Sequence, residues 1–160
     1  MEAGTRTRPA AASWRTLLAD YVEMTKPRVQ SLLLFTTVMT MEVAGRPPLH
    51  TVLLTCLGGA LSAGGAGAIN HALDRDIDRV MRRTAGRPVA SGRVSPAAAI
   101  VYGTLLGCAS FALLALTVNP LAAVLAMSGL LGYVLVYTLW LKRSTPQNIV
   151  IGGAAGAVPP

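Results

Sequence analysis

A short acidic stretch offers the side chains with the clearest capacity for chemistry. Asn70, Asp74 and Asp78 are spaced four residues apart, so a continuous helix would align them on one face. Their oxygens are the hard ligands that Mg²⁺ prefers, and Mg²⁺ often completes its shell with substrate phosphates. The pattern predicts that Asn70, Asp74 and Asp78 are catalytic residues that bind a magnesium ion, which would neutralise the charge on a departing diphosphate.

The same pattern also fits a plain solvated helix end. Asp78 and Arg82 would then form only an ion pair, worth a few tenths of a kcal/mol. The position of the acids favours the metal site, because Asp74 closely follows a long apolar run, where an unpaired charge is costly. Asp76 lies off the common face, so we expect it to pair with arginines or to support the metal ligands.

Basic residues beyond the acids are predicted to bind the diphosphate, because guanidinium groups match phosphate oxygens. This set is Arg82, Arg83, Arg87, Arg93 and Lys142. Weaker candidates for substrate contact are Lys26, Arg28, His71, Tyr137, Gln147 and Asn148. For Tyr137 the alternative is anchoring at a membrane surface; for His71 it is a polar residue at the interface, and for Gln147 and Asn148 it is helix capping.

The elements that position these residues are predicted to cross a membrane. Of the 160 residues, 52% are hydrophobic and only 13% are charged, against about 25% charged in an ordinary globular domain. Four long apolar runs cover roughly 29–44, 49–69, 97–118 and 121–141. A fifth run, 148–160, is too short to cross a hydrocarbon core of about 30 Å. We therefore expect an all-α, multi-pass transmembrane helical bundle with about four complete spans and a truncated fifth.

The basic residues fall on one side of this predicted arrangement. Thirteen of the 14 lysines and arginines flank the same ends of the runs, and Arg46 alone lies on the other side. Positive charge collects in cytoplasmic loops, which predicts a cytoplasmic N-terminal segment at 1–27 and a partial transmembrane domain at 28–160. The expected location is the plasma membrane, with the mitochondrial inner membrane as the alternative. This one-sided distribution of lysine and arginine explains the net positive charge of the chain, so no nucleic-acid partner is needed to account for it. The expected partner is the lipid bilayer.

The second apolar run is rich in small residues, including Gly58, Gly59, Gly64, Gly65 and Gly67. Small residues let membrane helices approach one another closely. Missing side chains also leave room for a large substrate. Both interpretations remain open from the sequence.

Taken together, these motifs resemble the UbiA-type intramembrane prenyltransferases, whose first aspartate-rich motif is similar to the Asn70–Asp74–Asp78 pattern. Three longer stretches are similar to the subgroup that farnesylates haem: MTKPRV at 24–29, 74–88 with its RDID core, and 137–160 with KRSTPQNIVIGG. The resemblance implies nine transmembrane helices around a cavity, Mg²⁺ as cofactor, and transfer of farnesyl from farnesyl diphosphate to a vinyl group of haem B. The product, haem O, implies haem A synthase or terminal-oxidase assembly as partners.

The chain departs from that family in length. Family members are about twice as long and carry a second aspartate-rich motif, whereas no acidic residue follows Asp78 here. We therefore expect the N-terminal half of such an enzyme, with the C-terminal half absent. The alternatives are a related prenyltransferase with an aromatic quinone-precursor acceptor, which the stretch 142–153 disfavours, and a non-catalytic membrane fragment.

Overall fold

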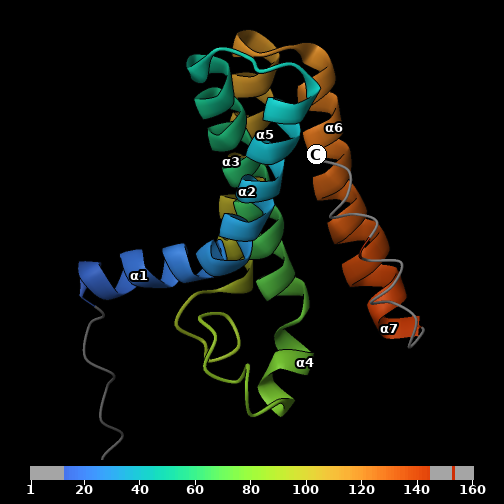
Figure 1. Ribbon diagram of the computed structural model, residues 1–160. Helices are drawn as coiled ribbons and strands as arrows, with labels where there is room; N and C mark the ends of the chain where they lie inside the picture. Colours follow the sequence, from blue (N-terminus) through green and yellow to red (C-terminus); the bar gives the residue numbers. More distant parts are fainter. Residues whose placement is uncertain (1–12, 145–152, 154–160) are drawn as a thin grey trace, which may run out of the picture.

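The computed structural model describes residues 13–144 and Gly153, and all of its regular elements are helices (Figure 1). Three helices are short: α1 (Trp14–Met24), α4 (Arg75–Val80) and α7 (Lys142–Ser144). They lie at the end of the molecule that carries the loop 81–95 with its arginines, which we call the polar end. The long helices are α2 (Pro27–Ala44), α3 (Leu49–Leu73), α5 (Pro96–Thr117) and α6 (Pro120–Leu131). A π-helix, η1 (Gly132–Leu141), continues α6 into α7.

Proline and capping residues explain where the long helices begin. Pro27, Pro96 and Pro120 each occupy the first turn, where the missing N–H is harmless and the fixed φ suits a helix. The caps before α5 and α6 are side chains that accept a backbone N–H: Ser95 from Ala98, and Asn119 from Ala122. Each such cap stabilises a helix by about 1 kcal/mol.

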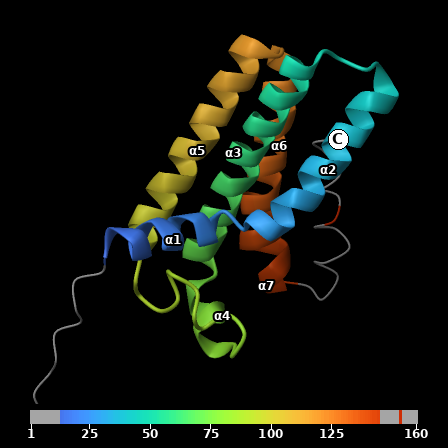
Figure 2. The same cartoon turned by 60° about the vertical axis from the view of Figure 1, so that its left-hand side comes forward.

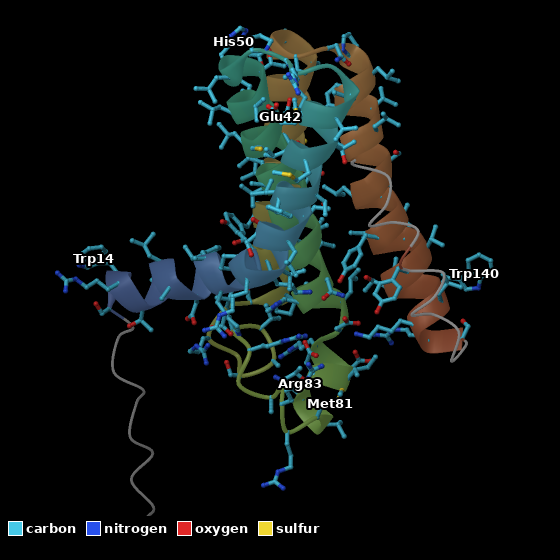
Figure 3. All side chains as sticks on the ribbon, viewed as in Figure 1. Trp14, Glu42, His50, Met81, Arg83 and Trp140 are labelled. Atoms are coloured by element: carbon cyan, nitrogen blue, oxygen red, sulfur yellow. The ribbon has the colours of Figure 1, made fainter. Side chains whose placement is uncertain are left out.

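The long helices run side by side, and α1 extends sideways from their polar end (Figures 1 and 2). The α2–α3 and α5–α6 turns lie together at the opposite end, close to His50, while Arg83 marks the polar end (Figure 3). The polar end also contains α4, the loop that leads to α5, and α7. The separation of basic loops from nearly uncharged turns predicted by the sequence is therefore present in the fold.

Three helical stretches of the described residues are long and apolar enough to cross a membrane: Leu49–Leu73, Pro96–Thr117 and Pro120–Ser144. They correspond to three of the four predicted spans. The fourth, predicted at 29–44, is the 18-residue α2, which packs against α3. Arg28, Gln30 and Glu42 make α2 more polar than the other three. The fifth predicted run, 148–160, lies outside the described residues apart from Gly153.

Glycines allow α3 and α5 to pack with their backbones almost in contact. A Cβ added at Gly65 would lie 2.6 Å from the carbonyl oxygen of Gly103, and a Cβ on Gly103 would lie equally close to the carbonyl oxygen of Gly65. The Ser110 hydroxyl on α5 donates a 2.7 Å hydrogen bond to the Gly58 carbonyl on α3. The small residues of α3 therefore allow close helix packing at this interface, as the first of the two interpretations predicted.

Candidate functional site

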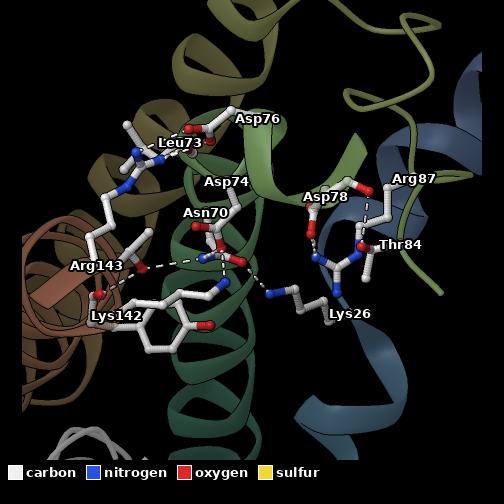
Figure 4. Close-up of polar contacts among 12 residues, drawn as sticks. Lys26, Asn70, Leu73, Asp74, Asp76, Asp78, Thr84, Arg87, Lys142 and Arg143 are labelled. Carbon is white, nitrogen blue, oxygen red and sulfur yellow. Dashed lines mark hydrogen bonds and ion pairs between the residues drawn. The ribbon is translucent and has the colours of Figure 1, made fainter. Parts of the chain in front are cut away.

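Asn70, Asp74 and Asp78 share one buried face at the polar end of α3 (Figure 4). The α-helix ends at Leu73, and Asp74 forms the junction with α4. Even so, the backbone keeps a four-residue register, because Asp74 N–H donates to Asn70 O at 2.9 Å and Asp78 N–H to Asp74 O at 2.8 Å. The common face expected from the spacing is thus present without a continuous helix.

Asn70 and Asp74 form the centre of a hydrogen-bonded cluster. The Asn70 amide donates to Asp74 Oδ2 at 2.6 Å, and Lys142 Nζ contacts the same oxygen at 2.6 Å. Lys26 Nζ donates to Asn70 Oδ1 at 2.7 Å, and the Asn70 amide also donates to the Thr138 hydroxyl at 3.2 Å. Asp74 Oδ1 is buried and has no hydrogen-bond partner among the described residues.

Asp78 is held by the loop that follows α4. Arg87 donates to both carboxylate oxygens of Asp78 at 2.8 Å, and the Thr84 hydroxyl donates to the Asp78 carbonyl at 3.1 Å. Asp76, by contrast, is exposed and pairs with Arg143 at 2.9 Å. That hydrogen bond lowers the pKa of Asp76. The expectation that Asp76 lies off the common face and pairs with an arginine therefore agrees with the structure.

Lys26 reaches the cluster from a strained turn. It has φ 56° and ψ 56° between α1 and α2, a left-handed conformation that costs a residue other than glycine of order 1–3 kcal/mol. Burial, together with the nearby positive charge of Arg87, lowers the pKa of Lys26 to about 8. Its Nζ also lies 5.8 Å from the centre of the Tyr133 ring. The turn therefore places a partly desolvated cation beside Asn70.

Several predicted phosphate ligands lie outside this cluster. Arg82 and Arg83 are exposed on the loop after α4, and the structure gives them no ion pair with the buried acids. Arg93 binds Asp20 at 2.9 Å instead, because its loop turns back onto α1. Of the four loop arginines predicted to bind the diphosphate, only Arg87 joins the cluster in this structure.

The weaker candidates also separate. Arg28 is exposed and makes no bond to the acids among the described residues. Gln147 and Asn148 lie outside the described residues. His71 is buried, and its Nδ1 has no hydrogen-bond partner among the described residues. Tyr137 stacks at 5.2 Å on Tyr133, which is the tyrosine that borders the cavity described next.

Thr138 is a site residue that sequence reasoning missed. It is fully buried and donates a hydrogen bond of 2.9 Å to the Tyr133 carbonyl, five residues earlier. This side-chain bond lies within the π-helix η1, and π-helical turns are frequent at functional sites. The wider turn lets Tyr133, Thr138 and Lys142 all face α3. No local sequence pattern marks a π-helix, so the contact of Thr138 with Asn70 could not be read from spacing.

A cavity of about 330 Å³ extends from the cluster between α2, α3 and α6. Lys26, Gly67 and Tyr133 line it at the polar end, and Thr37, Thr55 and Ala122 at the other. On α3 the wall includes Gly59, Ser62, Ala63 and Ala66, so the second interpretation of the small residues is realised here too. Its size is at the lower end of ligand pockets, about 300–1,000 Å³.

The described residues contain no group of three or more His, Cys, Asp or Glu side chains placed to hold a metal ion. The cluster instead combines two buried carboxylates, one amide and three cations. Lys26, Arg87 and Lys142 together exceed Asp74 and Asp78 by one positive charge. Such a site is suited to an additional anion, and its elongated apolar extension suits a hydrocarbon chain.

The sequence profile of the UbiA prenyltransferase family matches residues 31–160, and the chain belongs to this family. Its relatives include proteins named protoheme IX farnesyltransferase. Those from Chloroflexus aurantiacus and Stutzerimonas stutzeri are both 54% identical, over 99% and 96% of this chain. The one from Symbiobacterium thermophilum is 57% identical over 90% of it.

The chain spans about half the length of most of these relatives, 50% of the Stutzerimonas protein and 49% of the Symbiobacterium protein, and 27% of the Chloroflexus protein. No solved structure matches the chain.

Proposed function

We propose that this membrane protein carries the prenyl-diphosphate site of an enzyme that transfers a farnesyl group from farnesyl diphosphate to haem B. The observation that carries the proposal is the junction of cluster and cavity. Lys26 both bonds to Asn70 and lines the apolar cavity, so a cationic head site opens directly into a tail site. The names of the relatives supply the farnesyl group and the haem acceptor.

The residues of the cluster fit a divalent cation. The acidic and amide oxygens of Asn70, Asp74 and Asp78 form an oxygen donor set of the kind Mg²⁺ takes, and Asp74 Oδ1 lacks a hydrogen-bond partner among the described residues. Asn70, Asp74 and Asp78 would hold the metal. When bound, Mg²⁺ would neutralise charge that develops on the diphosphate as it leaves.

The basic residues would act by exchanging partners. Lys142 and Arg87 now neutralise Asp74 and Asp78. If those acids held the metal, Lys142 and Arg87 would be able to donate to phosphate oxygens instead, where charge-assisted hydrogen bonds are strong. Lys26, bonded to a neutral amide, is free to do the same. The diphosphate would then be contacted from three elements, α2, the loop before α5, and α7.

The transfer would use the acceptor's own electrons. The π pair of a haem vinyl group forms the new bond to the first farnesyl carbon as its bond to diphosphate breaks. Water adds to the carbon that becomes positive and loses a proton, leaving a hydroxyl group and free diphosphate. The ring of Tyr133, at the mouth of the cavity, is placed to stabilise an allylic cation through its face.

The proposal is tested in a chimaera in which this chain replaces the matching residues of the Stutzerimonas relative. In cells without another haem farnesyltransferase, Asp74→Asn and Asp78→Asn should each lower haem O, measured by chromatography of extracted haem, by orders of magnitude. Asp76→Asn removes an equal charge outside the buried face and should retain most activity. Equal losses at the three positions would contradict the site.

A further inference from the structure

The short helix α1 has two chemically distinct sides. Trp14, Leu18 and Val22 recur every four residues, with Leu17 beside them, and all four are exposed, Trp14 at 65% and Leu18 at 56%. Asp20 and Glu23 lie on the opposite side of the helix, at about 100° per residue. The exposed apolar side chains therefore form a stripe on one side of α1, which they share with the half-buried Tyr21, while the acids lie on the other side.

The contacts of α1 fix its rotation about its own axis. Arg93 binds Asp20 at 2.9 Å and Glu23 at 3.7 Å, so the acidic side faces the loop before α5. Tyr21 meets Tyr102 of α5 edge to face at 4.8 Å. Met24 is fully buried, and its carbonyl lies where a Cβ on Gly67 would be only 2.8 Å away. The apolar stripe consequently points away from the charged loop.

We propose that α1 lies flat in the membrane–water interface, with Trp14, Leu17, Leu18 and Val22 inserted among lipids. Figures 1 and 2 show α1 lying crosswise to the long helices and extending sideways from the end where they meet the loops. Its acidic side faces the loop, so its apolar side faces the layer through which α3 and α5 pass. Amphipathic helices bind membrane surfaces in this way, and 11 residues are too few to span a bilayer.

The first residues of α1 have the chemistry of the headgroup region. Trp14 begins the helix, and the Arg15 guanidinium lies 5.3 Å from the centre of its ring. Tryptophan and arginine both favour the interface, where the ring is half-buried and the charge stays in water. This refines the sequence prediction of a cytoplasmic N-terminal segment at 1–27, because it would place α1 at the membrane surface.

Trp14 itself reports on the proposal. The chain has two tryptophans, so Trp140→Phe leaves Trp14 as the sole indole in chain reconstituted into phosphatidylcholine vesicles. Lipids brominated near the headgroup should quench its fluorescence several-fold more than lipids brominated at the chain ends, and aqueous acrylamide should quench it little. Strong quenching by acrylamide alone would overturn the proposal. Protection from both quenchers would also overturn it, since a second copy or further chain would then cover the stripe.

A matched pair of substitutions adds a second readout. Leu18→Asp and Thr16→Asp each introduce one carboxylate into α1, the first on the apolar stripe and the second on the polar side. Leu18→Asp should shift Trp14 emission to longer wavelength and reduce quenching by the shallow bromines at least twofold, while Thr16→Asp should change neither. Equal effects of the two substitutions would contradict the placement of the stripe in lipid.

Discussion

At the level of single residues, the acids of the candidate site lie deeper than the bases that neutralise them. The side chain of Asp74 is 0% exposed and that of its partner Lys142 is 27% exposed, and Asp78 and Arg87 differ in the same way. The free energy needed to move the more exposed bases to a new anion is therefore lower than that needed to move the buried acids. This difference supports the proposed exchange, in which metal replaces the bases on the carboxylates.

Lys142→Met tests the role of one such base. Losing a charged hydrogen bond to phosphate, worth about 1.5–3 kcal/mol, should weaken diphosphate binding in the presence of Mg²⁺ roughly 10- to 100-fold. Calorimetry on the chain in lipid nanodiscs measures the affinity. Arg143→Met is the matched control, because Arg143 pairs with the exposed Asp76, and it should change the affinity less than twofold. Comparable losses in the two variants would show that only overall charge matters.

The spacing of residues predicted part of this site. The interval of four placed Asn70, Asp74 and Asp78 together because the backbone register survives the helix break. The affinity of arginine for phosphate could not tell Arg87 and Arg93 apart, because both follow the acids closely in the sequence. Which acid each arginine binds depends on how the loop folds back. Lys26 and Thr138 reach Asn70 from 44 and 68 residues away, and local pattern does not encode such contacts.

At the level of elements, hydrophobic runs predicted the bounds of α2 and α5 to within two residues. The helix α3 extends four residues past its expected end, and the run at 121–141 is divided between α6 and the π-helix η1. The sequence interpretation missed α1 because it sought long uncharged runs, whereas α1 carries Arg15, Asp20 and Glu23. Its apolar residues do recur at helical intervals, which is the pattern that reveals a surface helix. Which side of α3 meets α5 and which lines the cavity depends on tertiary packing.

The α3–α5 contact is predicted to be intolerant of even one methyl group. Gly103→Ala would place a Cβ 2.6 Å from the Gly65 carbonyl, so the helices must separate, at a cost of about 1–3 kcal/mol. Gly132→Ala is the matched control, because nothing lies within 4 Å of its Cβ position. Reversible unfolding in mixed micelles by added denaturing detergent should show the loss for Gly103→Ala only, and equal stability of the two variants would contradict close backbone packing.

The length of the cavity predicts which prenyl chain it accepts. Its lining covers 26–37 on α2 and 55–67 on α3, or about 16–18 Å at 1.5 Å per residue. With carbon–carbon bonds of about 1.5 Å, an extended farnesyl chain measures roughly 14 Å and a geranylgeranyl chain roughly 19 Å. The lined stretch is therefore long enough for an extended farnesyl chain, and an extended geranylgeranyl chain slightly exceeds it.

Gly59→Leu should shorten this cavity, because Gly59 lines it about 12 Å along α3 from Gly67. Farnesyl diphosphate should then lose at least tenfold in affinity relative to geranyl diphosphate, as competition binding would measure. Gly132→Leu adds the same side chain away from the cavity and should leave the ratio unchanged. An unaltered ratio in Gly59→Leu would show that the tail lies elsewhere.

At the level of the whole molecule, the proposed topology puts the cluster, α1 and the basic loops at the cytoplasmic surface. We predict that Arg83→Cys, in a background with Cys56 and Cys108 replaced by serine, resists an impermeant thiol reagent applied to intact cells. Arg46→Cys, at the opposite end of the bundle, should react. Labelling of residue 83 with protection of residue 46 would reverse the orientation.

The most direct test of the central claim locates the prenyl chain itself. A farnesyl diphosphate analogue with a diazirine at the end of its tail is bound to the chain with Mg²⁺, photolysed, and mapped by mass spectrometry. We predict adducts on cavity residues far from the cluster, such as Leu34, Thr55 and Ala122, which disappear when farnesyl diphosphate competes. Adducts on outward-facing residues such as Leu53 and Leu105, both exposed, that persist under competition would contradict it.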